Sequence, residues 1–335
     1  MSPPWLTPDG GLVAGVYRGV SDAAYRGIPA VSQSSLKIVG EQGPADYQWS
    51  REHPRSTDDL ILGSAVDCLL FDASEDHRIF EARFEVADSK AWPNATCAMC
   101  GAVPRAPCIT KKGEVSKTCH EGRRAAHVTD GREALSWEAA QEAHELARAL
   151  LGHPTAGRLL ATTEHQVPMV WQDPVTGVWM KGRLDCVRPG SHLDDVKTGR
   201  PGCAASPRAW AKHAWGFGYH YQAAAYHDGW QQLTGEDLPW SWVVAEKRQP
   251  YAAHIAIFHA TPAWLELGRK AYRRAAEMFR DCCAVGIWPG YQEEVQEVEP
   301  PAWAKVSELE SNATGDGSWL EGVDDTTISG SFLEG

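Results

Sequence analysis

The segment from Trp179 to Thr198 constrains the fold more than any other part of the chain. It predicts two β-strands joined by a tight turn at Pro189-Gly190. Asp185 lies near the end of the first strand, and Asp195 and Lys197 lie on the second. Because side chains alternate across a strand, Asp195 and Lys197 share one face. Two acids on neighbouring strands beside a lysine can hold a divalent cation next to an ammonium group, and this is the outline of a phosphodiesterase site.

The size and composition indicate an ordinary globular protein. The chain has 335 residues, enough for one large domain or two modest ones, with 43% apolar and 23% charged residues. No apolar run approaches the ~20 residues that span a bilayer, and the N-terminus lacks a basic-then-apolar signal. We therefore expect a cytoplasmic protein with no membrane partner. In that compartment nine cysteines indicate metal binding rather than disulfides.

The net charge of −12 does not exclude a DNA-binding protein, because most of it lies at one end. Residues 292–335 hold eleven acids and one base, which leaves 33 acids against 31 bases in the remaining chain. A nearly neutral body can present a basic groove although it also supplies a cluster of carboxylates.

The pattern along the chain predicts an N-terminal arm over residues 1–31, a main domain over 32–310 and a disordered acidic tail over 311–335. Ser32 and Ser136 are expected to cap helices, and another helix begins near Thr57 and carries Asp67 among apolar residues. Residues 80–86 read as a strand. Further strands are expected over 164–171, 178–186, 242–246 and 252–259, the last two as outer strands, and helices over 207–214, 219–232 and 262–285.

Phosphodiester hydrolysis needs an acidified water and compensation of charge on the phosphate, and Mg²⁺ held by carboxylates supplies both. Asp185 and Asp195 are the expected ligands, with the Val196 carbonyl as a candidate third ligand. Lys197 would orient the water or stabilise the developing negative charge. Gln222 and Tyr226 lie four apart on one helical face, where they could steady Lys197 or a phosphate.

Four segments together resemble the successive motifs of PD-(D/E)xK nucleases, and within them the phage and prophage exonuclease VIII (RecE-like) group. They are Gly63-Ser64-Ala65-Val66-Asp67, Gly182-Arg183-Leu184-Asp185, Asp195-Val196-Lys197-Thr198 and Gln222-Ala-Ala-Ala-Tyr226. The resemblance implies an α/β (α+β) restriction-endonuclease-like core, in which a mixed central sheet is flanked by helices. It assigns Asp185 and Asp195 as metal ligands, Lys197 as catalytic, and Gln222 and Tyr226 as supporting residues.

The same resemblance implies an exonuclease that uses Mg²⁺ (or Mn²⁺) and degrades one strand of duplex DNA from its end, 5′ to 3′. Relatives form homo-oligomeric rings around DNA and work with a single-strand annealing protein in phage recombination, which would place this chain in the host cytoplasm. Relatives usually have histidine where this chain has Asp67, and aspartate can also bind Mg²⁺. Glu164 aligns with a recurring acid on the first core strand and is a possible site residue.

A cysteine-rich insertion interrupts the domain over residues 90–127. Its polar composition cannot support a core of its own, whereas Cys97 and Cys100 could converge on one tetrahedral ion that two later ligands complete. The segment resembles a small zinc-binding module of phage proteins. By that pattern the zinc ligands are Cys97, Cys100, Cys108 and His120, with Cys119 as the alternate for the fourth place.

Two other functions stay open at this point. The same fold could serve a structure-selective endonuclease or DNA-repair nuclease. Alternatively, Asp67 in the usual histidine position could mark a catalytically weakened DNA-binding recombination protein.

Overall fold

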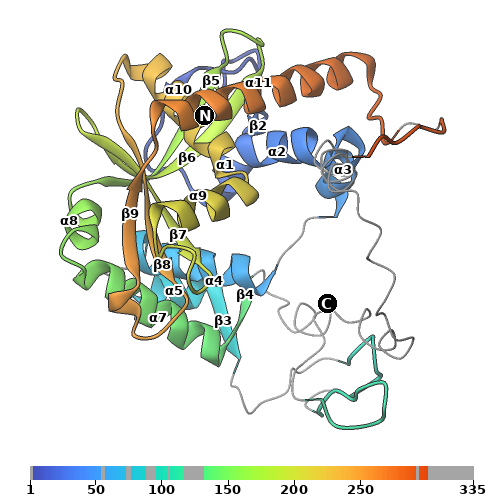
Figure 1. The fold of residues 1–335 in the computed structure, drawn as a ribbon, viewed down its shortest axis with the longest axis vertical. Coiled ribbons are helices and arrows are strands. Elements are labelled where there is room, and N and C mark those ends of the chain that lie inside the picture. Colours follow the sequence, from blue (N-terminus) through green and yellow to red (C-terminus); the bar gives the residue numbers. More distant parts are fainter. Residues whose placement is uncertain are drawn as a thin grey trace, which may run out of the picture. The chain divides into compact units, whose positions relative to one another are not determined.

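A mixed seven-stranded sheet forms the centre of the protein (Figure 1). The computed structural model describes residues 3–53, 57–72, 77–87, 96–103, 106–116, 132–291 and 294–300. The strands of this sheet are β1 (Gly15–Val16), β2 (Val31–Ser32), β5 (Glu164–Gln172), β6 (Trp179–Arg188), β7 (His192–Gly199), β8 (Trp240–Glu246) and β9 (Ile255–His259). Their order is β1-β5-β6-β7-β8-β9, with β2 paired in parallel to β6. The β7–β8 pair is also parallel, and the remaining neighbours are antiparallel.

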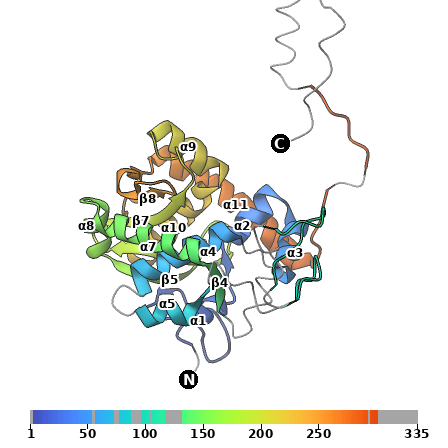
Figure 2. The same cartoon turned by 90° about the horizontal axis from the view of Figure 1, so that it is seen from below.

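Helices cover both faces of this sheet, and each side has its own apolar core. On one side lie α2 (Gln33–Glu41), α9 (Pro207–Gly216), α10 (Tyr219–Thr234) and α11 (Pro262–Val285), with α3 (Pro44–Glu52) packed on α2. On the other side lie α4 (Asp58–Asp67), the π-helical turn η1 (Cys68–Asp72), α7 (Trp137–Gly152) and α8 (Ala156–Ala161). Viewed from below, α4 and α7 lie in front of the strands (Figure 2). The predicted fold class, a mixed sheet flanked by helices, is confirmed.

Local sequence signals place several helix starts correctly. Ser32, Thr57 and Ser136 each accept a hydrogen bond at the side-chain oxygen from a backbone N–H in the first helical turn. The predicted boundaries of the long helix at 262–285 coincide with those of α11, which ends at Gly286 in a left-handed conformation.

Besides the strand expected over 252–259, which begins only at Ile255 because Tyr251–Ala253 form a 3₁₀ turn, two predicted elements differ from the structure. Residues 80–86 were expected to form one strand, but α5 (His77–Arg83) runs up to a short strand, β3 (Phe84–Ala87). The apolar residues there fit a period of two, which is typical of a strand. Phe80 and Phe84 also lie four positions apart, as on one helical face, and their ring centroids are 4.9 Å apart. β3 pairs with β4 (Glu133–Ser136) in a separate two-stranded sheet. The second difference concerns β8, which was expected to be an outer strand but lies between β7 and β9.

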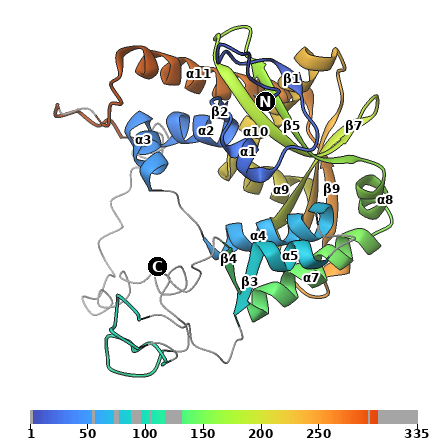
Figure 3. The ribbon, with the colours of Figure 1, turned by 180° about the vertical axis from the view of Figure 1, so that it is seen from behind.

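The N-terminal residues are not an extended arm. β1 pairs with β5 (Figure 3). A small apolar cluster forms around Trp5, Ile28 and Val170. The short helix α1 (Asp22–Arg26) ends against β6, where Lys181 Nζ donates to three carbonyls in and just after that helix. Carbonyl groups at a helix end lack intrahelical donors, so this lysine fixes the segment to the sheet.

Some predictions lie outside the described residues, including the acidic tail over 311–335 and the candidate zinc ligands Cys119 and His120. The chain divides into two compact units, Met1–Gly290 and Tyr291–Gly335. None of the helices in the described ranges is long and apolar enough to cross a membrane.

A network of ion pairs joins α10 to α11. Arg269 donates to both carboxylate oxygens of Asp228, at 2.6 and 2.8 Å, and the Tyr272 hydroxyl donates to the same group at 2.8 Å. Burial raises the pKa of Asp228, but hydrogen bonds from His227, Arg269 and Tyr272 outweigh burial and hold that pKa well below its usual range. A carboxyl with a lowered folded-state pKa stabilises the fold above its unfolded pKa of about 4 and loses that contribution as the pH falls.

We predict that Asp228→Asn lowers the free energy of unfolding at pH 7 by about 2 kcal/mol, because it removes charge-assisted hydrogen bonds from a largely buried site. Urea denaturation at pH 7 and pH 3 measures this, and the difference from the wild type should shrink at pH 3. Asp281→Asn is the matched control, since Asp281 is an exposed carboxylate on α11. An equal loss of stability at both pH values would contradict the assignment.

Candidate active site

β6 and β7 separate at the position where the candidate acids lie. Their ladder pairs Arg188 with His192 and ends at Cys186 and Asp194, so Asp185 is the first residue of β6 beyond it. The Val196 N–H, which has no β6 carbonyl opposite it in this ladder, donates to Asp185 Oδ2 at 3.1 Å. In an extended strand the N–H and C=O of one residue point to the same side, so the Val196 carbonyl faces the same gap.

Asp195 and Lys197 form a buried ion pair on β7. Asp195 is 1% exposed, and its Oδ2 is paired with Lys197 Nζ while its Oδ1 accepts a 2.6 Å hydrogen bond from Gln222 Nε2 of α10. Burial lowers the pKa of Lys197, but the charges of Asp195 and Asp185 outweigh burial, and the net pKa lies above its ordinary value. Lys197 is therefore a permanent ammonium group at neutral pH, which suits it to holding charge rather than accepting a proton.

Tyr226 reaches the site because β6 carries a glycine beneath it. A Cβ at Gly182 would lie 2.5 Å from the Tyr226 ring, so a larger residue there cannot coexist with this ring position. Burial raises the pKa of Tyr226 to about 12, while the backbone N–H of Arg183 donates to its hydroxyl. The side chain thus stays protonated and is held between α10 and β6.

Asp67, the last residue of α4, lies within electrostatic range of the other two acids. Burial raises its pKa well above the ordinary value, the negative charge of Asp185 raises it further, and Lys197 opposes this. A metal site needs several ligand atoms close together. In the described part of the chain, one group of three or more candidate side chains has its ligand atoms within 4.8 Å of one another, and that group consists of cysteines. The three aspartates therefore do not form a group of this kind, although Asp185 and Asp195 lie near each other.

The donor set suits a hard cation. Burial raises the pKa of Asp195, Lys197 lowers it and the nearby Asp185 raises it again, so two carboxylates stand close enough to repel each other. Carboxylate oxygens with a backbone carbonyl beside them are the ligands that Mg²⁺ and Mn²⁺ prefer. The residues present therefore fit the divalent ion that the sequence predicted.

Sequence reasoning missed Gln166. Among the described residues it is the one residue other than glycine with a positive φ, 50°, and the β5–β6 register puts it opposite Asp185. Its Nε2 donates to Asp185 Oδ1 at 3.4 Å. Strain of this kind is typical of functional sites.

The conformation of Gln166 changes which faces the two strands present. His165 contacts Phe71 on the α4 side, whereas Val167 lies in the core beneath α10, although residues two apart normally share a face. Leu184 and Cys186 are divided in the same way. Asp185 therefore lies where both strands change faces. The hairpin register could have paired Gln166 with Asp185, but nothing in a single sequence indicates the positive φ.

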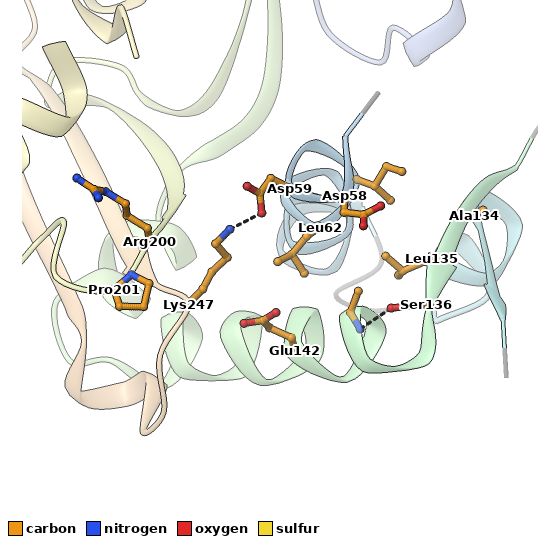
Figure 4. Close-up of a pocket in the computed structure, with 12 residues that line it drawn as sticks. Asp58, Asp59, Leu62, Ala134, Leu135, Ser136, Glu142, Arg200, Pro201 and Lys247 are labelled. Carbon is orange, nitrogen blue, oxygen red and sulfur yellow. Dashed lines mark hydrogen bonds and ion pairs between the residues drawn. The ribbon is translucent and has the colours of Figure 1, made fainter. Parts of the chain in front are cut away.

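Glu164, a possible site residue, pairs instead with Arg18 of the N-terminal segment at 2.7 Å. Two cavities lie on this part of the chain, and the first reaches the site through Gln166. One, of about 1,140 Å³, is lined by Gln166, Arg183 and Ser64 among others. The other, of about 360 Å³, lies where Lys247, in the loop after β8, reaches across to Asp59 at the start of α4 (Figure 4).

The cysteine cluster in the insertion consists of Cys97, Cys100 and Cys108, whose sulfurs lie within 4.8 Å of one another. The turn between the first two is closed by Gly101, which adopts φ 71° and donates its N–H to the Cys97 carbonyl at 2.8 Å. The Ile109 N–H donates to Cys100 Sγ at 3.4 Å. The apolar cluster of this segment contains little besides the cysteines and Ala102. The described residues of the insertion offer no larger apolar core, so a bound metal suits them.

Comparison with known proteins gives one family. Residues 40–300 match a family described as a PDDEXK-like domain of unknown function (DUF3799). No curated protein matches the sequence. A crystal structure from Eubacterium rectale, described as a "Putative exonuclease", is similar with a TM-score of 0.49 and 17% sequence identity, over 83% of this chain and 92% of that chain.

We predict that Gly182→Ala destabilises the protein by about 1–3 kcal/mol, because the added methyl group would overlap the Tyr226 ring and force it or β6 to move. Chemical denaturation measures the loss, and near-UV circular dichroism reports the displaced ring. Gly216→Ala, at the end of α9 with open space around its Cβ, is the control and should be neutral or stabilising by up to about 1 kcal/mol. Equal effects of the two substitutions would show that the contact with Tyr226 is unimportant.

Proposed function

The chain belongs to the PDDEXK-like family DUF3799, and from this premise we propose that it is a divalent-metal-dependent nuclease that degrades duplex DNA from its ends. The observation that carries the proposal is the buried Asp195–Lys197 pair beside Asp185, at the point where β6 and β7 separate. Two carboxylates can hold a metal ion that activates water, and the ammonium group beside them can compensate negative charge on the phosphate.

Each residue of the proposed site has a role that its contacts support. Asp185, Asp195 and the Val196 carbonyl would hold Mg²⁺ or Mn²⁺, with Asp67 at the end of α4 as a further acidic ligand. The ion, when bound, acidifies water and compensates phosphate charge. Lys197, kept charged by its acidic neighbours, would stabilise negative charge on the phosphate. Gln222 fixes the Asp195 carboxylate, Gln166 orients Asp185, and Tyr226 supports the strand that carries Asp185.

The finer features of the proposal rest on the resemblance to exonuclease VIII-like proteins. They are 5′ to 3′ polarity, release of single strands for phage recombination, a homo-oligomeric ring and a partner that anneals single strands. These stay predictions. The alternatives are an endonuclease or repair nuclease with the same site, and a weakened DNA-binding recombination protein, which Asp67 in place of histidine would favour.

A nuclease assay with Mg²⁺ on linear and covalently closed duplexes separates these functions. We expect loss of linear DNA alone, and Lys197→Ala should reduce the rate about 100-fold or more without changing the fold, because it removes the positive charge beside the phosphate. Lys270→Ala, an exposed lysine on α11, is the control and should cut normally. Cleavage of closed circles would favour the endonuclease. Absence of cleavage of both substrates would favour the DNA-binding protein. Full activity of Lys197→Ala would refute its assignment.

A structural zinc ion in the insertion is a separate part of the proposal. The three converging sulfurs and the N–H donated to Cys100 Sγ support it, since tetrahedral zinc takes thiolate ligands in turns of this kind. Zinc would supply the folding free energy that the short polar segment lacks. The fourth ligand is proposed to be His120, or otherwise Cys119.

We expect about one zinc ion per chain by elemental analysis of freshly purified protein. Cys108→Ser should lower this content, since serine does not replace a thiolate ligand, whereas Cys283→Ser, at an exposed cysteine of α11, should not. His120→Ala and Cys119→Ala compared in the same way identify the fourth ligand. Absence of zinc from the wild-type protein would overturn the zinc site and leave the nuclease proposal intact.

A further inference from the structure

The turn between α9 and α10 carries an exposed aromatic ring, Phe217, which contacts the Tyr219 ring beside Lys197. Tyr219, the first residue of α10, has its ring centroid 5.1 Å from Lys197 Nζ. The Phe217 ring lies 5.8 Å further on, tilted by 30° to the Tyr219 ring. Phe217 is 52% exposed, whereas Tyr219 is only partly exposed. The two rings therefore form a continuous path from the buried ammonium group to the surface.

The backbone that presents Phe217 is fixed from several directions. Its N–H donates to the His213 carbonyl at 3.1 Å, and its carbonyl accepts a 3.0 Å hydrogen bond from Lys37 Nζ of α2. Gly218 follows with φ 66°, and a Cβ there would lie 2.5 Å from the Lys37 side chain. Because the backbone of this turn is held firmly, it loses little conformational entropy when a ligand covers the ring.

Cations lie on two sides of this ring. Lys37 holds the Phe217 backbone carbonyl, although Glu41 on α2 partly offsets its charge, whereas Lys197 lies against Tyr219 and is paired with Asp195. On the other side the His213 ring contacts Phe217 at 4.6 Å. Burial lowers the pKa of His213, and the nearby charges of Arg200 and Lys247 lower it further. A half-exposed aromatic ring among cations is suited to a ligand that is both flat and anionic.

We propose that Phe217 is a stacking platform for a nucleobase of the DNA strand whose phosphate lies beside Lys197. The inference rests on the proposed nuclease function and deepens it, because it assigns a base-binding subsite next to the phosphate site. Every base offers an aromatic face, so such a platform accepts strands of any sequence while the flanking cations hold the backbone. An apolar peptide, the other occupant of an exposed ring, would gain nothing from those cations.

The test measures binding separately from cleavage. A Lys197→Ala chain is mixed, without cutting, with a single-stranded oligonucleotide that carries 2-aminopurine, and quenching of its fluorescence reports stacking. Phe217→Ala in this background should weaken binding about 10-fold and reduce the quenching, whereas Phe217→Trp should retain both. Trp215→Ala is the matched control. Trp215, near the end of α9, is 48% exposed but is stacked on His220 at 4.2 Å, and binding should change less than twofold.

A second measurement uses a duplex whose terminal nucleotides are abasic, so that no aromatic ring lies next to the phosphodiester, as substrate for the chain that retains Lys197. Phe217→Ala should hydrolyse it at the wild-type rate and lose activity only on the duplex with intact terminal nucleotides. Unchanged quenching by Phe217→Ala, or equal losses for Phe217→Ala and Trp215→Ala, would overturn the platform while leaving the nuclease proposal in place. Failure of the wild-type chain both to bind and to cut DNA would overturn the proposed function itself.

Discussion

The ion pair between Lys197 and Asp195 is the interaction on which the surrounding structure depends. Burying a carboxylate and an ammonium group costs free energy unless their remaining hydrogen-bonding capacity is also satisfied. Gln222 satisfies the second oxygen of Asp195, and the Tyr219 ring covers the ammonium group. Both side chains come from α10, so the position of that helix on the sheet is tied to the charge on β7. Without Lys197 the Asp195 carboxylate would keep only the Gln222 hydrogen bond, which weakens this contact while the two apolar cores still hold the fold.

The N-terminal segment extends this arrangement to the outer side of β6. Arg183, two residues before Asp185, donates to Asp22 at 2.8 Å, and the Tyr25 ring lies over the same guanidinium group. The pKa of Tyr25 is raised well above its ordinary value, first by burial and also by its contact with Tyr226. β6 is thus held between α10 on one side and α1 on the other, next to the residue at which it leaves β7. The segment that the sequence presented as an arm is part of the support for the candidate site.

The sequence predicted the features that depend on neighbouring residues better than those that depend on residues far apart in the chain. The hairpin around Pro189-Gly190 and the caps at Ser32 and Ser136 depend on a few neighbouring residues, and these predictions are correct. The apolar residues of 80–86 fit both the strand period and the helix period. In the structure Phe80 belongs to helix α5 and packs against His144 of α7, a contact that the sequence alone does not indicate. The partners of Glu164 and the strain at Gln166 depend on residues that come together only in the folded chain. The structure brings five predicted site residues close together, but their roles stay predictions. They are Asp185, Asp195, Lys197, Gln222 and Tyr226.

Asp67 changes the electrostatic balance of the proposed site rather than simply weakening it. A histidine in this place would be neutral or positive, and would leave two carboxylates against one ammonium group. With Asp67 ionised there are three carboxylates against Lys197, and Gln166 opposite Asp185 adds no charge. The excess of two negative charges equals the charge of one divalent cation. The raised pKa of Asp67 expresses the cost of that excess, because burial and Asp185 both disfavour its charged form. A cation that binds there would remove this cost, so the aspartate makes the proposed site depend more strongly on its metal ion than a histidine would.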